Sequence, residues 1–224
     1  MMDNRTLIAK RVAQEFKNGD IVNLGIGIPT LVADYISRTI NVTLHSENGF
    51  VGVGSAIHAE DSDLTNAGGQ LTTILAGGST FDSAMSFAII RGGHLDATVL
   101  GALEVDQEGN LANWMVPNKI VPGMGGAMDL VVGAKRVIVA MEHVGKGGTR
   151  KILKKCTLPL TACREVDLII TDYCVFEVTE QGLILKELAP NVSLQTVREF
   201  TEADYSISPD VKEMRVSDEV VLGC

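Results

Sequence analysis

Three short runs of almost wholly apolar residues constrain the fold of this chain more than any other feature of its sequence. They are Ala-Thr-Val-Leu at 97–100, Val-Ile-Val-Ala at 137–140 and Leu-Ile-Ile at 168–170. A strand that is apolar on successive side chains, and not on alternate ones, is buried on both faces. Such strands are typical of parallel sheets that helices cover on both sides. The sequence thus predicts an α/β protein built on an open, mostly parallel sheet with helices on both faces.

The first fifty residues predict the same arrangement. Gly25-Ile26-Gly27 forms a glycine turn between an apolar strand and a helix, and Pro29 suits the first turn of that helix. A strand, a helix and a second strand in this order imply parallel pairing. The expected elements are helices over 4–18, ended by Asn18-Gly19-Asp20, and over 31–36, with strands over 21–24 and 42–44.

The remainder of the chain continues this pattern and then changes. We expect a strand near 71–75 and a helix over about 80–91, followed late in the chain by a hairpin of 175–178 and 183–185. Ser193 can cap a last helix that ends at Phe200. We interpret residues 1–224 as one domain, with a charged tail that is frayed from about 209.

Charge and composition exclude several classes of function. The 224 residues carry a formal net charge of −9, which disfavours binding to nucleic acid or to anionic lipid. No run reaches the roughly 20 apolar residues that span a bilayer, so we expect no membrane contact and a cytoplasmic location. The four cysteines and four histidines lack the spacing of a metal site. We therefore expect free thiols and no bound metal.

Glu47 is the most informative polar residue. It follows the expected strand at 42–44 and precedes Asn48 and Gly49. Open α/β sheets bind ligands at the carboxyl ends of their strands, which makes Glu47 a candidate nucleophile and Asn48 and Gly49 candidate ligand contacts. Taken alone, Glu-Asn-Gly fits a surface turn at least as well.

Two glycine-rich turns are candidate anion or oxyanion sites. Gly25 and Gly27 precede a predicted helix, and Gly125 and Gly126 lie in Gly-Met-Gly-Gly-Ala-Met-Asp before another. Backbone N–H groups at such places can bind an oxyanion. Each turn is equally compatible with a tight connection that only lets two backbones pack closely. The first is not Gly-x-Gly-x-x-Gly, so a dinucleotide fold is not indicated.

Two further features keep alternative interpretations. His45 points to the same side of a strand as Glu47 and can hydrogen-bond near it, or it can be a packed or surface histidine. The lysines and arginine of 146–155 form a basic cluster that is either a solvated surface or a site for phosphate or for a partner.

The ordered set of motifs resembles the beta subunits of 3-oxoacid, acetate, butyrate and acetoacetate CoA-transferases. Each motif alone is weak, but their order over residues 4–200 is specific. The matching blocks are Ser46-Glu47-Asn48-Gly49, Asn66-Ala67-Gly68-Gly69, Phe81 to Phe87, Arg91-Gly92-Gly93-His94, Asn113 to Pro117, Gly123 to Leu130 and Cys156 to Thr161.

The resemblance implies an activity and a partner. The glutamate of the family's Ser-Glu-Asn-Gly motif attacks an acyl-CoA thioester, and here that residue is Glu47. It implies a ping-pong transfer of CoA between short-chain acids through a glutamyl-CoA thioester, with CoA as substrate and no permanently bound cofactor. It also implies an alpha subunit that supplies the rest of the site in an α2β2 assembly.

Two other functions remain open from the sequence. One is an enzyme on a similar sheet, such as a sugar-phosphate isomerase, which needs a general base but no covalent carboxyl intermediate. The other is a non-catalytic subunit of a CoA-using complex. The sequence does not choose among acetate, butyrate and acetoacetate, because one methylene contributes only about 1–3 kcal/mol of discrimination.

Overall fold

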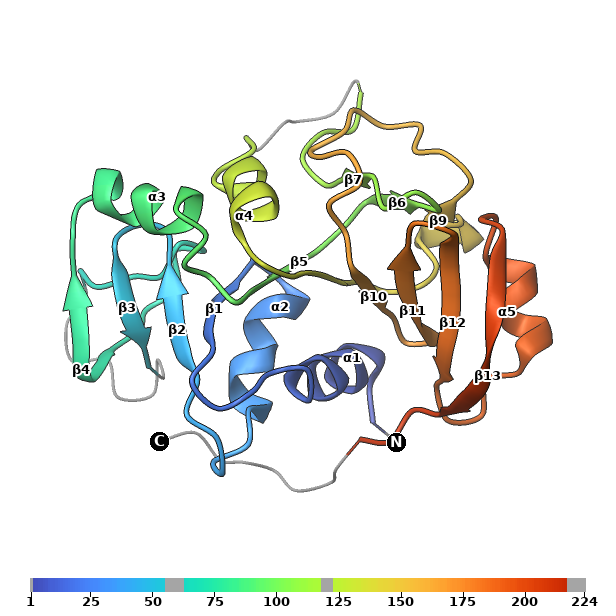
Figure 1. The fold of residues 1–224 in the computed structure, drawn as a ribbon, viewed down its shortest axis with the longest axis horizontal. Helices are drawn as coiled ribbons and strands as arrows, with labels where there is room; N and C mark the ends of the chain where they lie inside the picture. Colours follow the sequence, from blue (N-terminus) through green and yellow to red (C-terminus); the bar gives the residue numbers. More distant parts are fainter. Residues whose placement is uncertain (1, 55–62, 118–122, 217–224) are drawn as a thin grey trace.

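The protein is built on one large, mixed sheet. A computed structural model describes residues 2–54, 63–117 and 123–216. Within these segments ten strands pair in the order β13-β12-β11-β10-β8-β5-β1-β2-β3-β4, along the long axis of the molecule (Figure 1). The five central strands, β10, β8, β5, β1 and β2, are all parallel. Antiparallel β3 and β4 extend one end, and antiparallel β11 and β12 extend the other. The predicted open, mostly parallel sheet is confirmed.

The elements have the following bounds. The strands of the large sheet are β1 (Ile21–Leu24), β2 (Thr43–Ser46), β3 (Phe50–Val53), β4 (Ile74–Thr80), β5 (Ala97–Leu100), β8 (Val137–Ala140), β10 (Leu168–Ile170), β11 (Cys174–Thr179), β12 (Gly182–Leu188) and β13 (Tyr205–Glu213). A small second sheet contains β7 (Leu111–Ala112), β6 (Glu104–Asp106) and β9 (Ile152–Leu153). The helices are α1 (Asn4–Ala13), α2 (Ile28–Leu31), α3 (Ser83–Arg91), α4 (Ala127–Gly133) and α5 (Leu194–Phe200), with 3-10 turns η1 (Val32–Tyr35) and η3 (Lys146–Gly148).

Helices cover both faces of the parallel strands, as the apolar runs predict. α1 and α2 lie on one face and α3 and α4 on the other (Figure 1). In β8, Val137 and Val139 join the core cluster that contains Ile90 of α3. Ile138 joins the opposite cluster, which contains Ile8 of α1. Each such side chain contributes about 1.5–3 kcal/mol by leaving water, so the two-sided burial accounts for the apolar sequence of these strands. None of the helices in the described segments is long and apolar enough to cross a membrane.

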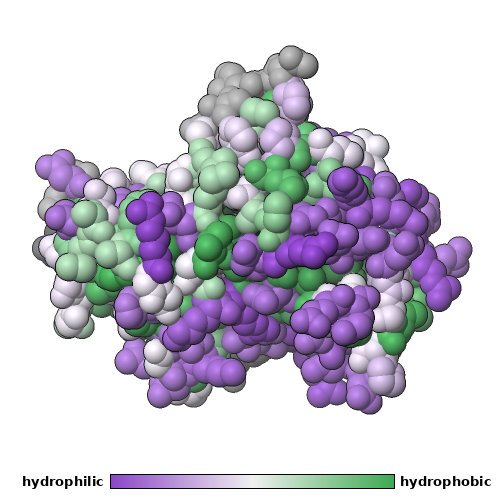
Figure 2. Space-filling view, turned by 45° about the horizontal axis from the view of Figure 1, so that its top comes forward, coloured by the Kyte–Doolittle hydropathy of each residue, from purple (hydrophilic) through white to green (hydrophobic). Residues whose placement is uncertain are grey.

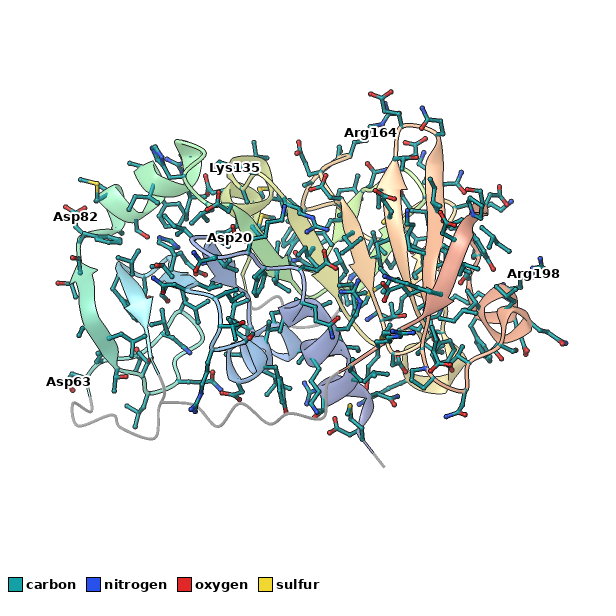
Figure 3. All side chains as sticks on the ribbon, turned by 60° about the horizontal axis from the view of Figure 1, so that its bottom comes forward. Asp20, Asp63, Asp82, Lys135, Arg164 and Arg198 are labelled. Atoms are coloured by element: carbon teal, nitrogen blue, oxygen red, sulfur yellow. The ribbon has the colours of Figure 1, made fainter. Side chains whose placement is uncertain are left out.

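Local capping fixes where α3 begins, and with it one wall of the later site. Asp82 accepts a hydrogen bond from the Met85 N–H at 2.8 Å, so the helix begins at Ser83. Asp82 lies at the β4 end of the sheet, where side chains fill both of its faces (Figure 3). The predicted cap at Ser193 is confirmed in the same way, by a bond of 3.0 Å from the Thr196 N–H.

Several predicted boundaries are wrong. α1 ends at Ala13 and not at 18, because the Gln14 N–H bonds back to Arg11 and Val12 and the chain then returns Phe16 to the core. The strand predicted near 71–75 lies at Ile74–Thr80. The tail is not frayed from 209, because β13 pairs with β12 up to Glu213 and Met214 is buried. Residues 217–224 of the predicted tail, and with them Cys224, lie outside the described residues.

A buried ion pair joins α1 to β12. Arg11 Nε and Nη2 donate to the Glu187 carboxylate at 2.7 and 3.1 Å, and Arg11 Nη1 donates to Glu15 at 2.6 Å. Both partners of the pair are less than one-tenth exposed. Burial acts to raise the pKa of Glu187, but the hydrogen bonds and charge of Arg11 outweigh it and hold that pKa below its usual value. The pair therefore secures the first helix to the distal part of the sheet only while both charges are present.

Replacing one partner of this pair is expected to destabilise the fold strongly. Arg11→Met leaves the Glu187 carboxylate buried without its main partner, which costs about 3–5 kcal/mol. The free energy of unfolding in urea measures this loss. In the double variant Arg11→Met/Glu187→Met we expect most of the stability to return, because no lone charge is then buried. A double variant as unstable as the single one would contradict this account.

Candidate active site

Glu47 lies where the sequence predicts it, at the carboxyl edge of the parallel strands. It comes directly after β2 and starts the turn that leads into antiparallel β3. Its side chain is half-buried. This edge is where open α/β sheets bind ligands, so the backbone brings a carboxylate to the expected place for chemistry.

Gly49 locks the turn that follows Glu47. Its N–H donates to the Ser46 carbonyl at 3.0 Å, and its own carbonyl accepts from the Phe81 N–H at 2.8 Å. Its φ of 129° and the position of the Phe81 carbonyl, which a Cβ would overlap, leave room only for glycine. The turn is therefore fastened to the segment that leads into α3.

Asn48 and Ser46 fasten the other side of the turn. The Asn48 amide donates to the Thr65 carbonyl at 2.7 Å, while Ser46 Oγ donates to Asn48 Oδ1 at 2.7 Å and accepts from the Ala67 N–H at 3.0 Å. These contacts hold the Asn66-Ala67-Gly68-Gly69 block beside the turn. The predicted roles of Asn48 and Gly49 in CoA binding stay predictions, since their polar groups already have these partners.

Asn23 is the direct partner of the Glu47 carboxylate. Its Nδ2 donates to Glu47 Oε2 at 2.9 Å, and its side chain is fully buried. β1 and β2 pair with Asn23 opposite His45, which brings the amide within reach of the residue just beyond β2. Sequence reasoning missed Asn23, although a lone amide in the otherwise apolar Ile21–Leu24 is a visible signal.

His45 is packed beneath the site. It is 2% exposed, its Nε2 lies 3.1 Å from Ser86 Oγ on α3, and its Nδ1 lies 3.4 Å from Asn23 Nδ2. Burial lowers the pKa of His45 to about 4, so its imidazole is neutral at physiological pH. Both sequence interpretations of His45 therefore hold, because it is a packed histidine that also bonds next to Glu47.

Gly126 brings the second glycine-rich turn against Glu47. A Cβ at Gly126 would lie 3.4 Å from Glu47 Cγ and 3.4 Å from the Phe87 ring. Gly126 caps the start of α4, and Phe87 lies on α3. The fold thus places the carboxylate between two helix segments, with apolar contacts on its methylene groups and space beside it.

The other predicted glycines have different positions. The Gly25 N–H donates to the Val99 carbonyl at 2.8 Å, so it is not available to an oxyanion. Gly27 precedes α2 and lines a cleft of about 300 Å³ with Ile26, Gly68 and others. Gly125, with a φ of 56°, is exposed beside Gly126. Of the two glycine-rich turns, only the second contacts Glu47 in the described residues.

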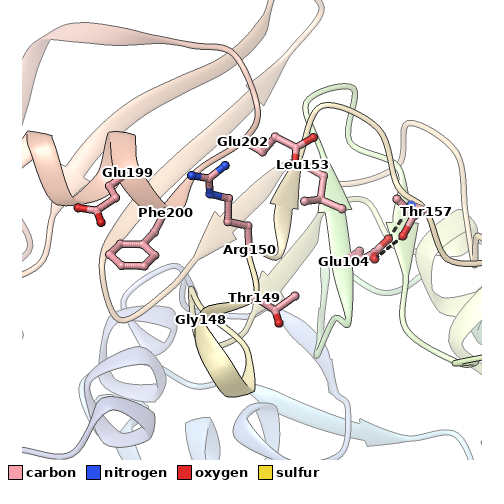
Figure 4. A pocket seen from close by; sticks show the side chains of 9 residues that line it. All are labelled: Glu104, Gly148, Thr149, Arg150, Leu153, Thr157, Glu199, Phe200 and Glu202. Carbon is pink, nitrogen blue, oxygen red and sulfur yellow. Dashed lines mark hydrogen bonds between the residues drawn. The ribbon is translucent and has the colours of Figure 1, made fainter.

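The basic cluster lies away from Glu47. Arg150 projects into a cleft of about 510 Å³ that also contains Glu199 and Glu202 (Figure 4). Lys154 pairs with Asp204 at 3.0 Å. Because acidic side chains line this larger cleft and Glu47 does not, it is a poor site for an anionic acyl-CoA. Of the predicted thiols, the structure describes Cys156, Cys163 and Cys174 as free.

The arrangement suits nucleophilic chemistry by a carboxylate. Among the described residues Glu47 accepts a hydrogen bond on Oε2 alone, from Asn23. Oε1 is therefore left to attack an electrophile, while the amide fixes the plane of the carboxylate. An oriented carboxylate with a covalent intermediate divides one difficult transfer into easier steps.

Comparison with known proteins agrees with this site. Residues 5–199 match the profile of the family described as Coenzyme A transferase. The beta subunit of the acetate CoA-transferase of Haemophilus influenzae is 60% identical over 218 residues, which cover 96% of this chain and 97% of that protein. The corresponding chain of the succinyl-CoA:3-ketoacid coenzyme A transferase of Helicobacter pylori is 52% identical over 205 residues, covering 91% of this chain and 99% of that one.

Solved structures share the fold. The acyl-CoA transferase YdiF of Escherichia coli O157:H7 is similar with a TM-score of 0.78 and 25% identity over 98% of this chain, which spans only 45% of that protein. Glutaconate coenzyme A-transferase of Acidaminococcus fermentans shows the same fold with a TM-score of 0.71 at 18% identity. The chain belongs to the coenzyme A transferase family, in which its similarity along nearly its whole length is to the beta subunits.

Proposed function

We propose that this chain is the glutamate-bearing beta subunit of a short-chain CoA-transferase and that Glu47 is its nucleophile. The observation that carries the proposal is the Glu47 carboxylate at the carboxyl edge of the sheet, held by Asn23 at 2.9 Å and flanked by Gly126. A YdiF structure described as a thioester complex with CoA supports a covalent route in a relative.

The reaction begins with attack of Glu47 on the acyl-CoA. The carboxylate oxygen bonds to the thioester carbonyl carbon, the C–S bond breaks, and CoA leaves as the thiolate, so that an acyl–glutamyl anhydride forms. The thiolate then attacks the glutamyl carbonyl carbon and the first acid leaves as its carboxylate. A second carboxylate repeats these steps in reverse and departs as the new acyl-CoA. The covalent route retains the free energy of the thioester, which hydrolysis would release.

The surrounding residues have separate tasks in this cycle. Asn23 orients the carboxylate through its contact with Oε2. Each attack develops negative charge on a carbonyl oxygen, and a preorganised N–H donor stabilises it by several kcal/mol. We assign that donor to the Gly125-Gly126 turn, which meets the Glu47 side chain.

The acids are small and aliphatic in this proposal. Acetate, butyrate and acetoacetate all fit the class, and the names of the similar proteins include acetate and 3-ketoacid transferases. Differences of one methylene are worth about 1–3 kcal/mol, so the preferred pair depends on details of the closed pocket.

A partner subunit is needed to complete the site. The anhydride must be kept from water, yet Glu47 is only half-buried in this chain. Helices α3 and α4, which flank it, expose Met85, Met128 and Val132 by 54%, 45% and 69%. Figure 2 shows apolar side chains between charged ones on the face that these helices form. We assign this surface to the alpha subunit, in an α2β2 enzyme.

Removing the nucleophile is expected to abolish half-reactions as well as full transfer. In the two-subunit enzyme, Glu47→Gln keeps the shape of the side chain but should lower exchange of labelled acetate into acetyl-CoA by at least roughly 10⁴-fold. The exposed residue Glu202 offers a matched control, since Glu202→Gln should exchange at the wild-type rate. Full exchange by the Glu47→Gln enzyme would exclude Glu47 as nucleophile.

A charge on the apolar surface should weaken assembly. We expect Val132→Asp to raise the dissociation constant for the alpha subunit at least about 10-fold, because a carboxylate would lose water in the interface. Ile207→Asp is the control, since Ile207 is 36% exposed on β13 at the far end of the sheet. Sedimentation velocity measures both. Loss of assembly in the control alone would place the interface elsewhere.

A further inference from the structure

We propose that His45 and Ser86 are positioning residues that hold the Asn23 amide, and through it the Glu47 carboxylate, in the orientation for attack. The inference rests on the proposed role of Glu47 and extends it by one layer beneath the site. It gives a function to a buried histidine and a buried serine that the reaction steps themselves do not use.

An unbroken series of polar contacts leads from α3 to the carboxylate. Ser86 Oγ lies 3.1 Å from His45 Nε2, and His45 Nδ1 lies 3.4 Å from Asn23 Nδ2. Asn23 Nδ2 then donates to Glu47 Oε2 at 2.9 Å. Ser86 and Asn23 are fully buried and His45 is 2% exposed, so water does not compete for these contacts.

The chemistry of the donors fixes the proton on His45. Asn23 must present its NH₂ group to Glu47, because its oxygen would repel the carboxylate. The same NH₂ group faces His45 Nδ1, which therefore accepts with its lone pair. Nε2 then carries the proton and donates to Ser86 Oγ. A neutral imidazole is required, and the burial of His45, with the Phe81 ring stacked at 6.3 Å, favours that form.

The other end of the Asn23 amide shows why this support matters. Its Oδ1 is buried and has no hydrogen-bond partner among the described residues. The orientation of the amide is therefore set on its nitrogen side alone, by Glu47, by the His45 carbonyl at 3.3 Å and by His45 Nδ1. Without the imidazole acceptor the amide gains freedom to rotate, and the carboxylate loses its fixed plane.

Two substitutions of His45 separate its nitrogens. In His45→Asn the side-chain oxygen can occupy the place of Nδ1 and still accept from Asn23. In His45→Gln the amide reaches the place of Nε2 and can bond only Ser86. In the two-subunit enzyme we expect His45→Gln to slow formation of the glutamyl-CoA adduct in a single turnover about 10- to 100-fold, with an unchanged KM for acetyl-CoA. His45→Asn should regain most of that rate.

Ser86→Ala provides a milder variant should a histidine variant fail to fold. Loss of one hydroxyl should slow adduct formation about 3- to 10-fold, again with KM unchanged. The inference is overturned if His45→Gln and Ser86→Ala form adduct at the wild-type rate. It is also overturned if rates fall only in proportion to the folded fraction. A wild-type complex that forms no adduct at all would instead refute the proposed function on which the inference rests.

Discussion

The parallel register between β1 and β2 is the constraint on which the site depends. It sets Asn23 opposite His45, so that both side chains lie on the α3 and α4 face and Glu47 begins the turn just beyond. A slip of one residue would turn the Asn23 amide to the opposite face of the sheet. The glycine turn at Gly49 then fixes the direction in which the carboxylate leaves the strand.

The site sits within a core that is otherwise apolar, and this has a cost in stability. Asn23 Oδ1 and its neighbour across the β1–β5 pair, Thr98 Oγ1, are buried with no partner among the described residues. An unsatisfied buried polar group costs about 1–3 kcal/mol. The apolar packing of both faces and the Arg11–Glu187 pair offset such costs elsewhere in the fold. Departures from an ideal core are expected to concentrate at functional sites, and here they lie next to Glu47.

Sequence patterns predicted the parts of the structure that depend on local residues. The runs at 97–100, 137–140 and 168–170 are strands with those bounds, and Glu47 lies at a strand end as expected. Contacts between distant segments were beyond the sequence. The Asn23–Glu47 bond depends on strand register, and the capture of the Gly25 N–H by Val99 depends on β5 lying beside β1. β6, β7 and β9 were missed because strands of two or three residues carry no readable period.

The central claim, that Glu47 carries CoA during the reaction, can be tested by mass. The two-subunit enzyme is incubated with acetoacetyl-CoA, reduced with borohydride and digested, and the peptide that contains Glu47 is weighed. Reduction of a glutamyl-CoA thioester to the alcohol should lower the mass of that residue by about 14 Da, and only when acyl-CoA is present. An enzyme that transfers CoA between acids while the Glu47 peptide keeps its mass would contradict the account.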